Sequence, residues 1–265
     1  MTLLIIGCGN MGGAMLDGWL AGGMADSAVT VVDPFREQVP PGVTLLRALP
    51  ENGAWDFVLL GIKPQQLAEA APAIAALIVD RTVLLSVLAG VDLDTLARYF
   101  PDAGGIVRVM PNLAAALGKS PVALCGTVRV DVRSAVSALM APLGPAEWIA
   151  DEGHMDLMTA LVGSGPAFVY RVIDALAQGA EMLGLPRSQA DRLALAMVNG
   201  AAELAAASDA SPAELARRVS SPGGTTLAGL SALDENSAIL GLMQETLRRA
   251  RDRGAELAEA ARVSN

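Results

Sequence analysis

The sequence has 265 residues, with 19 Lys and Arg against 28 Asp and Glu and a formal net charge of −9. Because an acidic surface repels phosphate backbones and only 3% of the residues are aromatic, nucleic acid is not an expected partner. The 52% hydrophobic content favours a buried core over disorder, and the uncharged runs are too short or too rich in Gly and Pro to predict a membrane span. Two cysteines and a start without a signal-peptide pattern favour a cytoplasmic protein.

The first 150 residues alternate short apolar runs with helical stretches. The predicted strands are Leu3–Ile6, Val29–Val32, Phe57–Leu60, Val83–Val87, Ile106–Met110 and Val122–Leu124, with Ala146–Ile149 as a candidate last strand. The predicted helices are Met11–Ala21, Pro64–Leu77, Leu93–Tyr99 and Val132–Leu139. This alternation predicts an α/β fold whose N-terminal domain, residues 1–150, is a Rossmann-type parallel sheet covered on both faces.

After Ala150 no strand-like run follows, and Ala- and Leu-rich helical stretches take over. The expected helices are Ala167–Leu183, Gln189–Ala207, one opened by a capping box at Ser211, and Ala238–Ala261. The sequence therefore predicts that residues 151–265 form an all-α C-terminal domain.

A dinucleotide-binding loop is predicted where the first strand meets the first helix. Gly7, Gly9 and Gly12 form G-x-G-x-x-G in this strand–loop–helix setting. Gly7 permits the tight turn, Gly9 lets a pyrophosphate approach the backbone, and Gly12 lets helix and sheet pack closely. The free N–H groups at the start of the helix then face the phosphates.

The second strand ends at Asp33, where an acidic side chain holds the ribose 2′-hydroxyl of NAD. Such a carboxylate disfavours a 2′-phosphate, yet Arg36 is close enough in sequence to receive one. Asp33 before Pro34 is also typical of a plain turn. The cofactor is therefore left as NADPH or NADH.

Two later strand ends lie at the same sheet edge. Lys63, between Ile62 and Pro64, is suited to contact a cofactor there, or is an ordinary solvated lysine. Small residues around Leu88 and Ala89 leave room for nicotinamide.

Two Gly-rich segments in the second half are each predicted to open a helix. They are Gly163–Pro166 and Ser220–Thr226. Backbone N–H groups and hydroxyls at a helix start favour an anion such as a carboxylate, although Ser and Thr also serve as ordinary caps. Two adjacent glycines followed by two threonines exceed what a cap requires.

The sequence resembles pyrroline-5-carboxylate reductases along nearly the whole chain. The segments that carry this resemblance are Gly7–Gly12, Ile62–Pro64, Ala89–Val91, Arg108–Asn112, Gly163–Phe168 and Val219–Thr226. The most specific block is Val219–Thr226. Three departures stand out: Val162 replaces a common Ser, Phe168 a usual Tyr, and Asp33 a small polar residue found in several NADPH-preferring members.

The resemblance implies that L-1-pyrroline-5-carboxylate is reduced to L-proline by hydride transfer from NADPH or NADH to the imine carbon. It also implies a homodimer through the helical domain, with further assembly in some members. The candidate cofactor-binding residues are Gly7, Cys8, Gly9, Asn10, Met11, Gly12, Asp33, Ile62, Lys63, Pro64, Leu88, Ala89 and Asn112. The candidate substrate-binding residues are Glu152, Ser164, Val219, Ser221, Gly224, Thr225 and Thr226.

Thr226 matches the family's threonine beside the imine nitrogen, which implies substrate orientation and a candidate catalytic role in proton donation. Because a neutral hydroxyl is a weak acid, water or a previously protonated iminium are alternative proton sources. Glu152 matches a substrate-contacting position, although an acid in this acidic stretch is otherwise interpreted as solvated. His154, the one histidine, is interpreted as a linker residue, and no metal site is predicted.

Two rival functions are weighed against this one. β-Hydroxyacid dehydrogenases share the layout but depend on a lysine in the first long helix of the second domain, and Ala167–Leu183 contains none. A non-catalytic nucleotide sensor would bind cofactor but would not need the Ser220–Thr226 segment.

Overall fold

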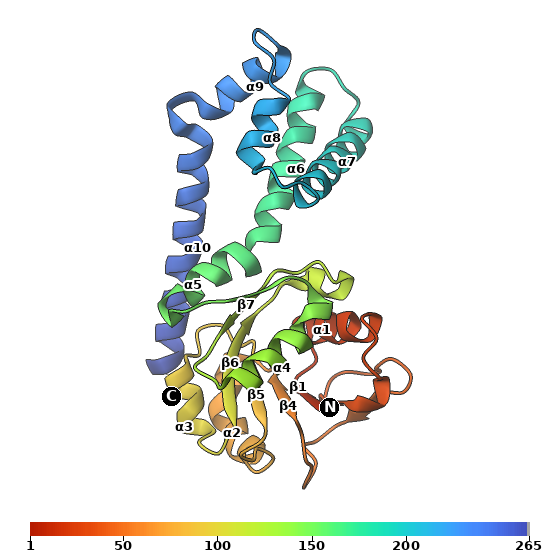
Figure 1. Ribbon diagram of the computed structural model, residues 1–265, viewed down its shortest axis with the longest axis vertical. Helices are drawn as coiled ribbons and strands as arrows, with labels where there is room; N and C mark the ends of the chain where they lie inside the picture. Colours follow the sequence, from red (N-terminus) through yellow and green to blue (C-terminus); the bar gives the residue numbers. More distant parts are fainter. Residues whose placement is uncertain (264–265) are drawn as a thin grey trace. The chain divides into compact units, whose positions relative to one another are not determined.

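The computed structural model describes residues 1–263. The chain divides into two compact units (Figure 1): Met1–Ser164 with the residues from Arg248 onward, and Gly165–Leu247. These bounds differ from the expected division at residue 150. The reason is that residues after 150 still pack on the sheet, where Met155 and Val162 join a cluster with Met110 and Cys125.

An eight-stranded sheet forms the centre of the first unit, in the order β3-β2-β1-β4-β5-β6-β7-β8. The strands are β1 (Leu3–Ile6), β2 (Val29–Val32), β3 (Thr44–Leu46), β4 (Phe57–Leu60), β5 (Val83–Ser86), β6 (Gly105–Met110), β7 (Val122–Cys125) and β8 (Ala146–Trp148). Neighbouring strands are parallel throughout, except that β6 and β7 are antiparallel.

The α/β class with a Rossmann-type, mainly parallel sheet is confirmed, and the antiparallel pairing of β6 with β7 is the one departure from the predicted parallel sheet. The connection 111–121 between β6 and β7 holds only the 3-10 helix η3 (Leu113–Leu117), which is too short to carry the chain back for a parallel pairing. β3 was not predicted from the sequence. Its three residues lie at the sheet edge and are partly exposed, so they form no buried apolar run.

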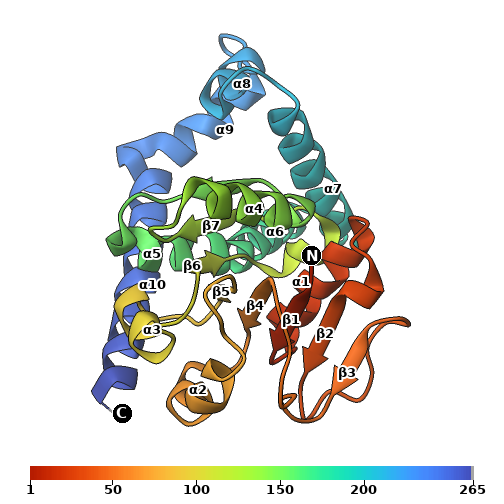
Figure 2. The same cartoon turned by 60° about the horizontal axis from the view of Figure 1, so that its bottom comes forward.

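Helices cover both faces of this sheet (Figure 2). On one face, α1 (Asn10–Ala21) and α4 (Val130–Met140) contribute Met15, Trp19 and Val136 to the core. On the other, α2 (Leu67–Ala75) and α3 (Leu93–Tyr99) contribute Ile74 and Leu96. Short 3-10 turns, η1 (Asp26–Ala28), η2 (Pro64–Gln66) and η4 (Ala141–Leu143), join these elements. The two layers fix the carboxyl ends of β1, β4, β5 and β6 along one edge.

After β8 a series of short helical elements leads through the first Gly-rich segment into α6. It consists of η5 (Glu152–His154), α5 (Met155–Met158) and the π-helical turn η6 (Thr159–Gly163), and α6 begins at Gly165. The amide of Ser164 donates to the carbonyl of Thr159 at 2.9 Å. The expectation that a helix starts within Gly163–Pro166 is confirmed, but a π-helical turn precedes it instead of an open Gly-rich turn.

The second unit contains the remaining helices. They are α6 (Gly165–Met182), α7 (Arg187–Ala206), α8 (Pro212–Arg218), α9 (Thr225–Asp234), the 3-10 turn η7 (Glu235–Ser237) and the first part of α10 (Ala238–Val263). Helices α6 and α7 pack through Ala177, Ala190 and Ala194. Arg187 bridges them with an ion pair to Asp174 at 2.8 Å.

By length and composition alone, the helical run Glu152–Met182 is apolar enough to cross a membrane. A single run of this kind is weak evidence, because helices in the core of soluble proteins have the same composition. Here the π-helical turn interrupts the run, and Arg171 and Asp174 form an ion pair within it.

Candidate cofactor and substrate sites

The Gly-rich loop begins at the end of β1, where Gly7 has a φ of +84°. A Cβ at Gly7 would lie 2.7 Å from the carbonyl carbon of Gly61 and the amide nitrogen of Ile62, so the loop after β4 approaches too closely for a side chain. A Cβ at Gly12 would lie 2.7 Å from the carbonyl oxygen of Gly7. The tight turn and the close helix packing predicted for these two glycines are therefore both present.

Gly9 has a different role, because a Cβ built there would meet no atom within 4 Å. It is the N-cap of α1 and no side chain caps that end of the helix, so the first amides of α1 face open space. This open, uncapped helix start fits a pyrophosphate, which would accept from the amides and be stabilised by the helix dipole.

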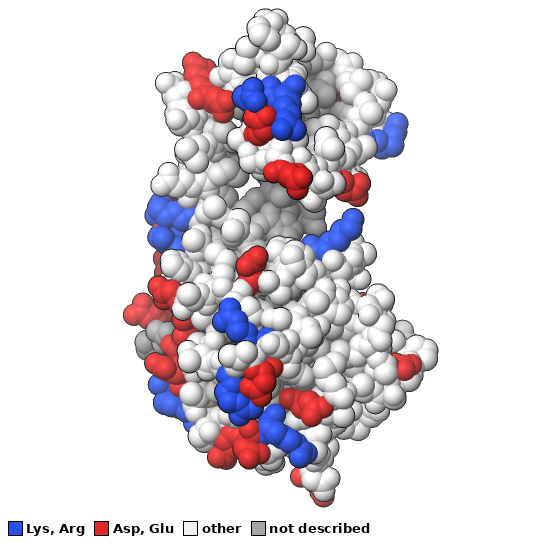
Figure 3. Space-filling view, viewed as in Figure 1, with Lys and Arg blue, Asp and Glu red and all other residues white. Residues whose placement is uncertain are grey.

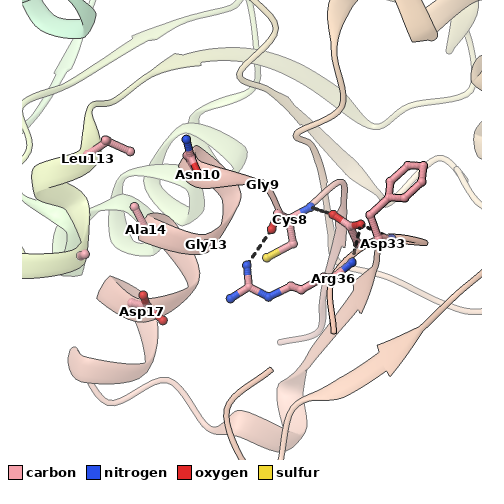
Figure 4. A pocket seen from close by; sticks show the side chains of 11 residues that line it. Cys8, Gly9, Asn10, Gly13, Ala14, Asp17, Asp33, Arg36 and Leu113 are labelled. Atoms are coloured by element: carbon pink, nitrogen blue, oxygen red, sulfur yellow. Dashed lines mark hydrogen bonds between the residues drawn. The ribbon is translucent and has the colours of Figure 1, made fainter. Parts of the chain in front are cut away.

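A cavity of about 600 Å³ lies beside this helix start (Figure 4). The Gly-rich loop, α1, the end of β2 and η3 form its wall. The lining residues are Cys8, Gly9, Asn10, Gly13, Ala14, Asp17, Asp33, Phe35, Arg36, Leu113 and Ala116. The lining residues of α1 beyond Gly12 and those of η3 were not predicted from the sequence.

Asp33 is 9% exposed, and three backbone amides donate to its carboxylate. The Cys8 amide donates to Oδ2 at 2.8 Å, and the amides of Phe35 and Arg36 donate to Oδ1 at 2.8 and 3.1 Å. Burial alone would raise the pKa of Asp33, but these hydrogen bonds and the Arg36 charge outweigh it and hold the pKa below the ordinary 3.8. Asp33 therefore fastens the Gly-rich loop to the loop after β2.

Arg36 extends along the cavity wall (Figure 4). Its Nη1 donates to the Cys8 carbonyl at 2.7 Å and its Nε to the Gln38 carbonyl at 3.0 Å. A Cβ at Gly13 would lie 3.0 Å from Nη1, so a glycine at this position gives the guanidinium its room. Among the described residues, Arg36 forms no ion pair with a carboxylate. Its Nη2 donates no hydrogen bond to any of these residues.

Cys8 belongs to the Gly-rich loop and is 2% exposed. Burial is the main cause that raises the pKa of its thiol to about 11; Asp33 and Asp17 add to the rise and Arg36 opposes it. The thiol is protonated near neutral pH and is not an active nucleophile.

The residues after β4 and after β5 differ in which groups they expose to a ligand. Lys63 is exposed; its amide donates to Gln66 Oε1 at 3.0 Å, and its carbonyl accepts from the Gln66 amide at 2.9 Å at the start of η2. Leu88 is 2% exposed, with its side chain in the core on the α2–α3 face, so only its backbone is available to a ligand. Ala89 is exposed beside it.

Two other candidates are engaged in protein contacts. Asn112, at the end of β6, is 6% exposed; its Oδ1 accepts from the Ala114 amide at 2.9 Å and its Nδ2 donates to the Val162 carbonyl at 3.1 Å. Oε1 of Glu152 accepts from Arg108 Nη1 at 2.7 Å and from the Leu93 amide at 2.8 Å. The Arg108 side chain is only 7% exposed, so Glu152 neutralises a buried charge.

In the second unit, the Ser220–Thr226 segment turns the chain from α8 into α9. The Gly224 amide donates to the Ser221 carbonyl at 2.9 Å, and Gly223 has a φ of +70°. Gly224 is the N-cap of α9 and no side chain caps that end of the helix. Ser221, Thr225 and Thr226 are exposed, so hydroxyls and free amides lie together at a helix start.

The whole chain resembles one set of known enzymes. Over 265 residues it is 33% identical to the pyrroline-5-carboxylate reductase of Pseudomonas aeruginosa, with 97% of each chain covered. The chain belongs to the pyrroline-5-carboxylate reductase family. The family member from Aquifex aeolicus is likewise 33% identical over 266 residues, with 97% of each chain covered.

Structural and domain comparisons agree. The solved pyrroline-5-carboxylate reductase of Coxiella burnetii is 26% identical, covers 98% of both chains and superposes with a TM-score of 0.85. A family model described as pyrroline-5-carboxylate reductase dimerisation matches residues 152–257, and one described as NADP oxidoreductase, coenzyme F420-dependent, matches residues 2–90.

Within this family framework, the first unit brings Gly7–Gly12 and Asp33 together around one cavity, with Lys63, Ala89 and Asn112 on neighbouring strand ends. Val219, Ser221, Gly224, Thr225 and Thr226 lie together in the second unit, whereas Glu152 and Ser164 belong to the first. The individual roles of all these residues stay predictions. The sequence indicated Arg36 only as an alternative, a residue that could receive a 2′-phosphate. Its place on the cavity wall depends on Gly13, which is not one of the three glycines of the G-x-G-x-x-G motif.

Proposed function

We propose that this protein reduces L-1-pyrroline-5-carboxylate to L-proline with NADPH or NADH. The observation that carries the proposal is its full-length similarity to pyrroline-5-carboxylate reductases, combined with a dinucleotide loop free to receive a pyrophosphate. In the reaction a hydride adds to the imine carbon and a proton to the nitrogen, so that the C=N bond becomes a C–N single bond.

The residues of the first unit bind and orient the cofactor, which supplies the hydride when bound. The open space at Gly9 and the uncapped start of α1 fit its pyrophosphate. The exposed Ala89 and Lys63, at the carboxyl edge of the sheet, are assigned to its nicotinamide half. Most of the rate acceleration then comes from holding two reactants in place.

The turn before α9 is assigned to the substrate. The substrate carboxylate accepts from the free amides of the helix start and from the hydroxyls of Ser221 and Thr225. Thr226 orients the imine nitrogen. Since a neutral hydroxyl is a weak acid, the proton reaches the nitrogen from water through Thr226, or is already present on an iminium substrate.

We assign the protein a preference for NADPH. Three backbone donors already occupy the Asp33 carboxylate, while the Arg36 guanidinium lies on the same cavity wall and forms no ion pair with a carboxylate of the described residues. A 2′-phosphate bound there pairs with Arg36. The positive charge of Arg36 offsets the negative charge of the nearby Asp33 carboxylate.

We further assign the second unit to substrate binding and to a homodimer. Apolar side chains such as Tyr170, Leu193 and Leu204 are more than half exposed. On the face in Figure 3, much of the surface over these helices is uncharged. Exposed apolar surface of this extent is typical of subunit interfaces. A cytoplasmic location fits the two free cysteines.

The test follows the absorbance of NADPH and of NADH with purified protein, with and without L-1-pyrroline-5-carboxylate. The expected result is substrate-dependent oxidation with formation of proline. Thr226→Ala is expected to lower kcat/KM about a hundredfold with an unchanged melting temperature. The exposed helical Ser231→Ala serves as the matched control. No substrate-dependent oxidation with either cofactor would refute the proposed reaction.

A further inference from the structure

Asn112 connects the carboxyl edge of the sheet to the π-helical turn η6. Its Nδ2 donates to the Val162 carbonyl at 3.1 Å, while its Oδ1 accepts from the Ala114 amide at 2.9 Å and caps η3. Its own amide donates to Ser120 Oγ at 2.8 Å. Both ends of the side-chain amide are therefore used inside the protein, and the side chain has a fixed orientation.

The Val162 carbonyl lacks its usual α-helical donor. In an α-helix it would accept from the amide of residue 166, but that residue is Pro166 and has no N–H. Val162 is 7% exposed, and an unpaired carbonyl at such a depth is costly. Asn112 thus supplies, from the end of β6, a hydrogen bond in place of the α-helical one that Pro166 is unable to donate.

The same contact places the π-helical turn against the end of β6. A Cβ at Gly163 would lie 3.3 Å from the Met110 sulfur, so η6 lies directly against the last residue of that strand. The next residue is Ser164, and neighbouring β5 leads to Ala89 at the same edge. π-Helical turns occur frequently at functional sites because they shift the residues that follow them.

We propose that Asn112 is a positioning residue for the reaction. By holding the Val162 carbonyl it fixes Ser164 at the sheet edge where the nicotinamide half of the cofactor is assigned. This inference rests on the proposed function. It gives the side chain of Asn112 a role in substrate alignment in place of the cofactor contact expected from the sequence.

Two variants remove the hydrogen bond from Asn112 Nδ2 to the Val162 carbonyl and keep an oxygen that caps η3. Asn112→Asp keeps Oδ1 for the Ala114 amide but places an oxygen against the Val162 carbonyl. Asn112→Ser also keeps a capping oxygen, but its side chain is too short to reach Val162 and adds no repulsion. For both variants we expect kcat/KM for L-1-pyrroline-5-carboxylate to fall about tenfold or more, because small misplacements of a reactant are costly. The Kd for NADPH, measured by titration, is expected to stay within about twofold.

The matched control is Ser120→Ala, which removes the hydrogen bond to the Asn112 backbone and leaves the Nδ2 contact with Val162 in place. It is expected to lower the melting temperature while changing kcat/KM by less than about twofold. Amide hydrogen exchange of Thr159–Ser164 gives a readout that does not depend on activity, and it should become faster in the Asn112 variants but not in Ser120→Ala.

The outcomes are distinguishable. A loss of NADPH affinity that parallels the loss of activity would overturn the inference in favour of a direct cofactor contact. An unchanged kcat and KM with a lowered melting temperature would reduce Asn112 to a purely structural role, and unchanged exchange at Thr159–Ser164 would refute the tether. If the wild-type protein oxidises no NADPH with this substrate, the proposed function fails, and the exchange result still decides whether Asn112 fixes the turn.

Discussion

At the scale of single residues, the contacts of Asp33 and Arg36 change what an acidic residue after the second strand indicates about the cofactor. A carboxylate at the end of the second strand ordinarily indicates NAD, because it binds the ribose hydroxyls. Here three backbone amides donate hydrogen bonds to that carboxylate, and the Arg36 guanidinium lies on the wall of the same cavity. The acidic residue alone therefore does not decide which cofactor is used.

Replacing Arg36 tests this assignment. Arg36→Ala is expected to raise KM for NADPH about tenfold, because a charged hydrogen bond to the 2′-phosphate is lost, and to leave KM for NADH nearly unchanged. Steady-state kinetics with both cofactors measure the difference. Arg129→Ala, which removes a cation that is 71% exposed and ion-paired on the surface, is the control. An equal loss with NADH and NADPH would contradict the 2′-phosphate contact.

Asp33 also predicts a pH dependence of stability. Its pKa is depressed in the folded protein, so the stabilisation it contributes is present above its unfolded pKa and is lost as the pH falls through the lower folded pKa. Asp33→Asn is therefore expected to lower the free energy of unfolding by about 2 kcal/mol near neutral pH. The difference from wild type should shrink below about pH 4. Urea unfolding over this range measures it, with the exposed Asp102→Asn as control; a constant difference would show that the Asp33 charge is not responsible.

At the scale of secondary-structure elements, the ion pair of Arg108 and Glu152 fastens three elements. Arg108 lies in β6, Glu152 begins η5, and the Leu93 amide at the start of α3 donates to the same carboxylate oxygen. A buried ion pair contributes little by itself, but the removal of one partner leaves an uncompensated charge. Glu152 is thus tied to the helix starts around it.

Glu152→Ala should accordingly destabilise the protein by about 3 kcal/mol, because it leaves Arg108 buried without its counter-charge. The exposed Glu147→Ala on β8 is the matched control and should change stability by less than about 0.5 kcal/mol. Chemical unfolding measures both. If Glu152→Ala instead keeps wild-type stability and raises only KM for the substrate, the carboxylate binds substrate as the family resemblance implies.

At the scale of the whole molecule, several large apolar side chains of the second unit are exposed. On α7, Ala190 and Ala194 face α6, whereas Leu193, Met197 and Leu204 are each more than half exposed. Together with the match of residues 152–257 to a dimerisation domain, this pattern supports a subunit interface on these helices.

The double variant Leu193→Glu with Met197→Glu is expected to convert the assembly to monomers at micromolar concentration, because two charges would be buried without partners. Its melting temperature should fall and lose its dependence on protein concentration. Analytical ultracentrifugation measures the mass, with the exposed Gln189→Glu on the same helix as a charge control. A double variant that keeps the wild-type mass would place the interface elsewhere.

Local sequence determined much of this protein. The spacing of Gly7, Gly9 and Gly12 between a strand and a helix, the alternation of strands and helices, and the turn before α9 each depend on residues near one another in the chain, so their physical causes are visible in the sequence. For the same reason the edge strand β3 and the direction of β7 were not visible, since both are set by pairing with other strands.

Only the tertiary structure decided what the polar side chains do. Asp33 receives the Cys8 amide from 25 residues away, Glu152 meets Arg108 from 44, and Asn112 meets the Val162 carbonyl from 50. A buried polar group must find a partner wherever the fold supplies one, and that partner is not marked by local spacing. The sequence therefore determined the family and the two candidate sites, and the folded chain decided which candidate residues are exposed and which make hydrogen bonds inside the protein.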